Sequence, residues 1–234
     1  MSEIKVLDKG YVRLVSSHGD DLAIVRAARV SYDAEWRSGE DAGKDAKLIS
    51  YMLKNGHTSP FEHVTFTFEV KAPIFIFRQW HRHRMWSYNE LSARYTEMPD
   101  EYYVPDPAVI GTQSASNKQA RDIAADADGV EIPGYLLDQI IAYRQTCNGA
   151  FRQYGALIAA GWPRELARAV LPVATYSKMF ATVDLHNLLH FLKLRLHPHA
   201  QWEIRQYAQA MLDLIDPIVP AAITAWRGAI PPIE

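Results

Sequence analysis

The sequence has little of what several common protein classes require. It contains a single cysteine, Cys147, in 234 residues, which excludes a disulfide framework, a cysteine-based zinc site and an iron–sulfur cluster. Its apolar runs are far shorter than the roughly 20 residues of a membrane span. The first residues lack the long apolar stretch of a secretory signal peptide, so we expect a cytoplasmic protein with no membrane partner.

Familiar nucleotide and hydrolase motifs are also missing. The sequence has no G-x-G-x-x-G, no G-x-x-x-x-G-K-[ST] and no G-x-S-x-G, so neither a Rossmann site, a P-loop nor a nucleophile elbow is indicated. Its 25 Lys and Arg against 27 Asp and Glu give a net charge of −2, which provides no global positive field for nucleic acid. With 48% hydrophobic and 22% charged residues, the chain has the composition of a globular protein and can build a core.

The apolar periodicity predicts one α+β domain over residues 1–234, with an antiparallel sheet flanked by several helices. Val64, Phe66, Phe68 and Val70 alternate with polar residues, as in a half-buried strand. Helical spacing predicts helices at about 20–29, 41–54, 73–82, 135–160, 184–196 and 199–215. The proline- and glycine-rich segment 99–134 is predicted to be irregular, with at most a short helix near 117–125.

A basic stretch begins at Arg78, in the sequence R-Q-W-H-R-H-R. Residues 78–95 contain four arginines and one glutamate in a chain that is acidic overall. The planar guanidinium group fits a phosphate, so one interpretation is a site for a phosphorylated ligand. A solvated basic face, arginines paired with acids elsewhere, and a nucleic-acid patch with interleaved aromatics are the alternatives.

The predicted helix 184–196 carries an arginine on its apolar side. Leu185, Leu188, Leu189 and Leu192 form the stripe, and Arg195 follows Leu188 by seven residues and Leu192 by three. Such an arginine either extends its charged end past the core into water, or its guanidinium is a cation held at the edge of a dry pocket. In the second case it would stabilise negative charge that develops on a substrate.

Histidines and the lone cysteine carry weaker signals. His186 and His190 are four residues apart on a predicted helix, and H-x-H patterns occur at 81–83 and 197–199, which suggests a metal site. No carboxylate stands at the spacing of a known zinc motif, so we predict no metal. Cys147 lies on the apolar face of the predicted helix 135–160, where a small buried side chain is expected rather than a nucleophile.

Several sequence blocks resemble the flavin-dependent thymidylate synthases. Arg82-His83-Arg84, followed after seven intervening residues by Ser92, matches that family's R-H-R-x7-S signature. The other matching blocks, in the family's order, are A-R-V-S at 28–31, H-x-S-P-F-E-H at 57–63, S-Y-N-E-L-S-A-R-Y at 87–95, A-R-x-V-L-P at 167–172 and H-A-Q-W-E-I at 199–204. The resemblance therefore extends from residue 28 to about residue 207.

The resemblance implies a homotetramer that binds FAD at subunit interfaces and converts dUMP to dTMP. The carbon would come from 5,10-methylenetetrahydrofolate, and reduced FAD, regenerated by NADPH, would supply the hydride. No cysteine nucleophile is needed in this family, and several chains build the flavin site without a Rossmann fold. These implications agree with the missing motifs. The phosphate of dUMP and the pyrophosphate of FAD would be the anions that the arginines of the basic stretch bind.

The resemblance also implies roles for individual residues, with each active site shared between chains. Flavin contacts are implied for His57, Ser59, Arg82, His83, Arg84, Glu90, Asp184, His186 and His190. The sequence departs from some relatives at the last three, where Asn, Arg and Asn also occur. Contacts to dUMP are implied for Gln79, Arg82, Glu90, Leu91, Ser92, Ala93, Arg94, Arg168 and Arg195. Gln79 and Arg82 would come from one chain and residues 90–94 from another, and Arg168 would reach the dUMP site from a neighbouring chain. Arg195 would be the catalytic residue, stabilising ionisation at uracil N3.

Overall fold

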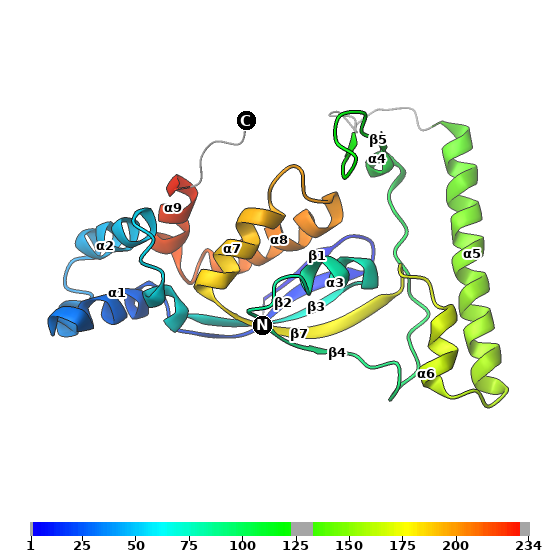
Figure 1. Cartoon of the computed structure of the whole chain (residues 1–234), viewed down its shortest axis with the longest axis horizontal. Helices are drawn as coiled ribbons and strands as arrows, with labels where there is room; N and C mark the ends of the chain where they lie inside the picture. The colour runs from blue at the N-terminus through cyan, green and yellow to red at the C-terminus, as the bar shows by residue number, and fades with distance from the viewer. Residues whose placement is uncertain (1, 123–132, 230–234) are drawn as a thin grey trace.

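The computed structural model describes residues 2–122 and 133–229 (Figure 1). A five-stranded sheet with the order β1-β2-β3-β7-β4 lies at its centre, and every neighbouring pair of strands is antiparallel. The strands are β1 (Glu3–Val6), β2 (Gly10–His18), β3 (Thr65–Pro73), β4 (Ser87–Glu90) and β7 (Tyr176–Asp184). The predicted α+β class with an antiparallel sheet is therefore confirmed.

Strand β3 has the alternation that the sequence predicts. Phe66, Phe68 and Val70 are fully buried on one face, and the threonines and glutamate between them lie on the other. The strand continues to Pro73, and α3 (Ile74–Trp80) starts directly after it. The prediction that Pro73 begins a helix reaching Arg82 was therefore wrong at both ends: Pro73 keeps an extended backbone conformation and is the last residue of the strand.

Helices cover one face of this sheet (Figure 1). They are α1 (Asp21–Arg29), α2 (Ala42–Lys54), α7 (Leu185–Arg195), α8 (Trp202–Ile215) and α9 (Pro220–Ala229). Four of them match predicted helices, whereas α9 was not predicted. Asp20, Asp41 and Asp184 each accept backbone N–H groups at the start of their helix, which satisfies donors that would otherwise lack partners.

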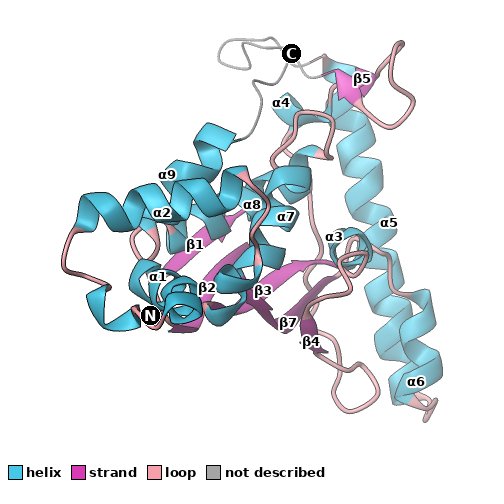
Figure 2. Cartoon of the chain, turned by 60° about the vertical axis from the view of Figure 1, so that its left-hand side comes forward, coloured by secondary structure: helices cyan, strands magenta, loops and turns pink. Residues whose placement is uncertain are grey.

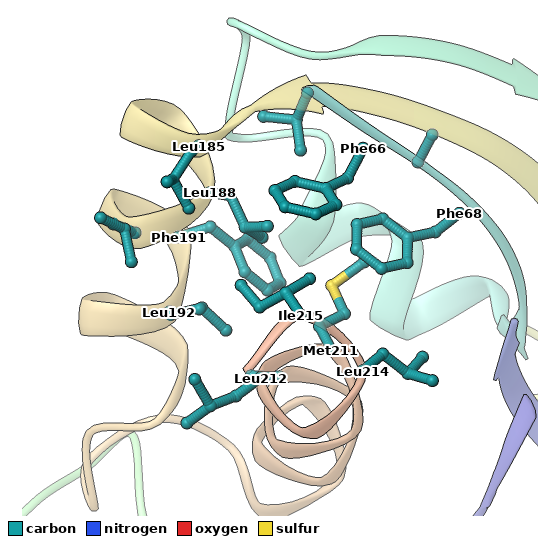
Figure 3. Close-up of a cluster of buried hydrophobic side chains, with 14 of the residues drawn as sticks. Phe66, Phe68, Leu185, Leu188, Phe191, Leu192, Met211, Leu212, Leu214 and Ile215 are labelled. Atoms are coloured by element: carbon teal, nitrogen blue, oxygen red, sulfur yellow. The ribbon is translucent and has the colours of Figure 1, made fainter. Parts of the chain in front are cut away.

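The main core lies between the sheet and helices α7 and α8. Figure 3 shows Phe66 and Phe68 of β3 facing Phe191 of α7 and Met211 and Ile215 of α8. All five side chains are almost completely buried. Burying each such side chain contributes roughly 1.5–3 kcal/mol, so this cluster fixes α7 firmly on the sheet.

Helix α5 (Gly134–Ala159) stands beside the sheet rather than on it (Figures 1 and 2). Cys147, Phe151 and Tyr154 are its buried residues, and Cys147 is only 3% exposed, next to Tyr102 and Ala174. The prediction that Cys147 is a packing residue agrees with this burial. The other side of α5 presents large apolar side chains to solvent, among them Ile141 at 54% exposure.

The segment before α5 is irregular, as predicted, but its local structure differs. It holds a short helix α4 (Pro107–Ile110) and a small hairpin of β5 (Thr112–Gln113) and β6 (Arg121–Asp122). The predicted helix at 117–125 was wrong as far as residue 122, and 123–125 lie outside the described residues. Asn117 forms a turn there instead, since its side chain accepts the N–H of Gln119 and its carbonyl accepts that of Ala120.

Four short 3-10 segments and one short α-helix complete the described elements. They are η1 (Val30–Tyr32), η2 (Glu35–Arg37), η3 (Ser59–His63), α6 (Arg164–Ala167) and η4 (Arg168–Val170). Within the part of the chain that the structure describes, no helix is long and apolar enough to cross a membrane.

Candidate active site

Two cavities near helix α3 contain most of the predicted site residues. The first, here named the Arg168 cavity, has a volume of about 600 Å³. Predicted or basic-stretch residues that line it are Arg78, His81, Glu90, Leu91, Ser92, Ala93 and Arg168. It thus combines two guanidinium groups with a hydroxyl and a carboxylate, a set that can hold a phosphorylated polar ligand.

The Arg168 cavity owes its form to a small apolar cluster beneath it. Ala93 packs with Ala167, Met98 and Tyr154, and the Tyr154 hydroxyl accepts the backbone N–H of Met98 at 3.2 Å. Because each buried alanine is next in sequence to a predicted ligand residue, their packing brings Ser92 and Arg168 together on one wall. Within one chain, Ser92 and Arg168 therefore line the same cavity.

Arg94 does not line this cavity. Its Nη2 lies 3.3 Å from Oε2 of Glu165, and both side chains are more than half exposed. Such a surface ion pair contributes only about 0–1 kcal/mol, so it holds Arg94 loosely near the cavity. Arg168 is attached to the same segment, since its Nε donates to the carbonyl of Glu165 at 3.3 Å.

The second cavity, here named the His190 cavity, has a volume of about 570 Å³ and lies between α7 and the segment after α3. It is lined by five predicted flavin residues, Arg82, His83, Arg84, His186 and His190. Met85, Trp86 and Asn187 also line it and were not predicted. The R-H-R motif and the histidines of α7 therefore meet, although about a hundred residues separate them in the sequence.

Asp184 serves the His190 cavity indirectly. Its carboxylate caps α7 by accepting the backbone N–H of Asn187 at 2.9 Å and the Asn187 side-chain amide at 2.7 Å. Asp184 does not line either cavity, so its direct contact with flavin stays a prediction. The D-x-x-N spacing was the available signal for Asn187, because an N-cap aspartate orients the residue three positions later.

A hydrogen bond between Arg195 and His83 connects α7 to the R-H-R motif. Nε of Arg195 donates to Nε2 of His83 at 3.0 Å, and its Nη2 donates to the carbonyl of Gln79 at 3.1 Å. Burial, followed by the charges of Arg195 and His190, lowers the pKa of His83 to about 4. The imidazole is therefore neutral at pH 7 and accepts the hydrogen bond.

Arg195 is a half-buried cation whose partners are both neutral. Burial lowers the pKa of its guanidinium. Among residues 2–122 and 133–229 no carboxylate lies within ion-pair distance of it. The guanidinium is held by two hydrogen bonds and does not extend freely into solvent, which disfavours the first interpretation of the sequence. A fixed cation of this kind can offset negative charge on a ligand.

His57 and Ser59 do not line either cavity. Ser59 begins η3, and the exposed ring of His57 stacks on Tyr51 with 6.0 Å between ring centroids. The turn lies against the start of α7, because the N–H of Leu185 donates to the carbonyl of Val64 at 2.8 Å. Both residues therefore lie beyond the N-terminal end of the helix that carries His186 and His190.

The histidine patterns do not gather into a metal-binding group. Among the described residues, no three His, Cys, Asp or Glu side chains lie close enough together to hold a metal ion. The His197 ring instead accepts the backbone N–H of His199 at 3.2 Å, and the two rings contact each other edge to face.

Comparison with known proteins adds independent information about this site. Residues 13–221 match the family described as "Thymidylate synthase complementing protein". The flavin-dependent thymidylate synthase of Thermus thermophilus is 48% identical over 96% of this chain and 78% of its own length. That of Thermosipho africanus is 43% identical over 96% of this chain and 93% of its own length.

Solved structures show the same fold. A UMP/dUMP methylase from Streptomyces cacaoi bound with 5-bromo-dUMP superimposes with a TM-score of 0.83 at 36% identity, covering 96% of this chain and 97% of that one. The same methylase bound with 5-bromo-UMP gives a TM-score of 0.83 at 37% identity, covering 97% of both chains. With its R-H-R-x7-S signature placed beside an arginine-rich cavity, this chain belongs to the flavin-dependent thymidylate synthases, a family of nucleotide-methylating enzymes.

Proposed function

We propose that the enzyme converts dUMP to dTMP by reductive methylation, taking carbon from 5,10-methylenetetrahydrofolate and hydride from reduced FAD that NADPH regenerates. The observation that carries the proposal is Arg195, a half-buried cation that donates hydrogen bonds to Gln79 and to His83, and His83 lines the His190 cavity. The names of the relatives support the flavin, and the neighbour bound with 5-bromo-dUMP supports the nucleotide.

The residues around the His190 cavity fit the chemistry of FAD. Arg82, Arg84 and three histidines offer donors for a pyrophosphate, and the buried indole N–H of Trp86 has no hydrogen-bond partner among the residues that the structure describes. We therefore assign FAD to this cavity. When bound, the flavin supplies the hydride, whereas the protein supplies position and electric field.

The two faces of α3 support an active site completed by a second chain. Successive residues of an α-helix are rotated by about 100°. Arg78 and His81 line the Arg168 cavity, whereas the Gln79 side chain is turned away from it and contacts Gln201. A nucleotide that contacts both Gln79 and Arg168 would then receive them from different chains.

Exposed apolar side chains support assembly into the proposed homotetramer. Tyr135 and Ile141 on α5, Leu166 on α6, and Phe180 on β7 are all at least 45% exposed. Uncovered apolar surface of this extent on several elements is typical of subunit interfaces.

In the assembled site each set of residues has a distinct role. Ser92, Arg94 and Arg168 hold the nucleotide phosphate through charge-assisted hydrogen bonds. Gln79 and Arg82 from the other chain hold the remainder of the nucleotide. Arg195 stabilises the negative charge on the uracil ring, and its partial burial strengthens this effect because water screens it less.

The proposal is tested by the colour and turnover of the purified protein. Bound oxidised FAD should give a yellow protein that absorbs near ~450 nm, a property of the cofactor itself. We expect dTMP only when dUMP, NADPH and 5,10-methylenetetrahydrofolate are all present, and UMP in place of dUMP measures selectivity for the sugar. A colourless protein that binds oligonucleotides with a steep salt dependence would contradict the proposal.

A further inference from the structure

The carboxylate of Glu203 is linked to Gln79 through Gln201 and lines neither the Arg168 cavity nor the His190 cavity. The side chain of Glu203, in the first turn of α8, is 1% exposed. Its Oε1 accepts from Nη2 of Arg121 at 2.8 Å and from the hydroxyl of Tyr103 at 3.2 Å. Its Oε2 accepts from Nε2 of Gln201 at 2.8 Å. The carboxylate is thus fully engaged inside the protein.

This carboxylate fixes the direction of a chain of hydrogen bonds. An ionised carboxylate can only accept, so Gln201 must turn its NH2 toward Glu203 and its carbonyl oxygen away. That Oε1 accepts from Nε2 of Gln79. Gln79 must therefore also turn its NH2 inward, which directs its own Oε1 to the other side. The orientation of both amides follows from the charge state of one buried group.

We propose that Glu203 is a positioning residue that sets the polarity of the Gln79 amide, so that Gln79 Oε1 accepts a hydrogen bond from the bound nucleotide. The inference rests on the proposed function, in which Gln79 holds dUMP. The available donors of dUMP are the base N3–H and the sugar 3′-hydroxyl. The contact is made with the neutral nucleotide on binding, before charge develops on the ring.

Glu203→Gln tests the polarity directly. The introduced amide would still accept from Arg121 and Tyr103 through its oxygen, but its NH2 would face Gln201. Gln201 would then turn its oxygen to position 203 and its NH2 to Gln79, and Gln79 would present NH2 in place of Oε1. We expect the Kd of dUMP, measured by calorimetry on the flavin-loaded protein, to rise about tenfold, as for one lost hydrogen bond with an unpaired donor.

An exchange of the two side chains provides the rescue. In Glu203→Gln/Gln201→Glu, the amide at position 203 donates to a carboxylate at position 201, which must accept from Gln79 as in the parent. We expect the Kd of dUMP to return to within about threefold of the parent value. Tyr103→Phe is the matched control: it removes a hydrogen bond to the same carboxylate without changing either amide, so it should lower the melting temperature and leave the Kd unchanged.

The two possible donors are separated by analogues. If N3–H is the donor, Glu203→Gln should reduce the preference for dUMP over dCMP, because cytosine has no hydrogen on N3. If the 3′-hydroxyl is the donor, the parent and Glu203→Gln should bind 2′,3′-dideoxyuridine monophosphate equally. The proposal would be contradicted if Glu203→Gln bound dUMP more weakly but neither lost preference for dUMP over dCMP nor matched the parent in binding 2′,3′-dideoxyuridine monophosphate.

Failure of the inference is distinguishable from failure of the proposed function. A flavin-loaded parent that does not form dTMP would refute the function itself. A parent that forms dTMP, together with an unchanged Kd in Glu203→Gln, or a Kd that the exchange does not restore, would refute only the role of Glu203. If Glu203→Gln does not fold, Gln201→Met at an exposed position must still raise the Kd of dUMP, because the Gln79 amide is then free to rotate; an unchanged Kd would overturn the proposal.

Discussion

Arg195 and His83 form a direct hydrogen bond, with the arginine Nε as donor and the histidine Nε2 as acceptor at 3.0 Å. The bond joins the last residue of α7 to the central residue of the R-H-R motif. The tautomer of His83 with its proton on Nδ1 is therefore required. Two features that stand far apart in the sequence thus act as one unit, and a change in either should disturb the other.

Arg195→Lys should be damaging although the charge is kept. Lysine lacks the planar fork that binds His83 and Gln79 simultaneously, so its ammonium would not be held in place. We expect the oxidation of reduced flavin by dUMP and methylenetetrahydrofolate to slow by ~10²–10³-fold, as for a lost electrostatic contact to developing charge. Single-turnover absorbance measures this step. Flavin reduction by NADPH should be affected less, and a thermal melt of the same sample controls for folding. A folded, flavin-loaded variant with the parent's oxidation rate would show that Arg195 has only a structural role.

Stability should fall at mildly acidic pH because of His83. Its pKa is about 4 in the folded protein, below the usual 6.5, since burial and the charge of Arg195 oppose protonation. As the pH falls from 6.5 toward 4, the unfolded chain takes up this proton and the folded chain does not. The stabilisation present above pH 6.5 is therefore lost across that window. We expect the melting temperature to drop more between pH 7.5 and 5.0 in the parent than in His83→Gln, which keeps an acceptor for Arg195. Parallel pH profiles would contradict this assignment.

Two inactive variants should complement each other only when they alter residues that different chains contribute to one active site. Arg195→Ala and Arg168→Ala, mixed and allowed to exchange subunits, should recover partial activity, because some sites receive Arg195 from one chain and Arg168 from the other. Recovery is measured as dTMP formation before and after exchange, with exchange confirmed by mass spectrometry.

The matched control for complementation uses residues of one cavity. Arg168→Ala mixed with Ser92→Ala should recover nothing, because both side chains line the same cavity of the same chain. Activity in both mixtures, or in neither after confirmed exchange, would argue against a site shared in this way.

Arg82→Ala should weaken flavin and dUMP binding together. Arg82 is the first residue of the R-H-R motif and lines the His190 cavity, where one guanidinium can serve two anionic ligands. A charge-assisted hydrogen bond contributes ~1.5–3 kcal/mol, so each affinity should fall at least about tenfold. Flavin absorbance after dialysis and calorimetric titration with dUMP measure the two effects. Full flavin content with unchanged dUMP affinity would remove Arg82 from the site.

Cys147→Ala should retain dTMP formation. The thiol is buried on α5, and burial raises its pKa, so the reactive thiolate is disfavoured. The change should cost about 1 kcal/mol of stability through lost packing, visible as a small decrease in melting temperature. Loss of turnover in a stable, flavin-loaded variant would revive the hypothesis of a cysteine nucleophile.

Sequence patterns predicted one central strand and six of the helices, α1, α2, α3, α5, α7 and α8, because their periods are regular. The same alternation exists in β7, where Met179, Ala181 and Val183 are buried, so that strand was within reach of sequence reasoning. Strand β4 was not, because Ser87, Asn89 and Glu90 are all exposed and leave no apolar period. Its place in the sheet depends on pairing with β7 alone.

The site was predicted by motif and not by geometry. Trp86 and Glu203 escaped prediction because their roles arise from contacts between distant segments, whereas Asn187 had a local signal in the D-x-x-N spacing. The sequence shows that an arginine-rich motif and a leucine-lined arginine exist. Only the packing of α7 on the sheet shows that His83 accepts from Arg195.

The pairing of β3 with β7 has a consequence for how the enzyme matures. The hydroxyl groups of Thr67 and Thr182 meet at 2.9 Å across a sequence separation of 115 residues. Closing so long a loop is entropically costly and slow, and β4 can join the sheet only after β7 is in place. Every wall of both cavities belongs to this loop or lies next to its ends. We therefore expect ligand binding to be among the last properties to return on refolding, after helical structure has already formed.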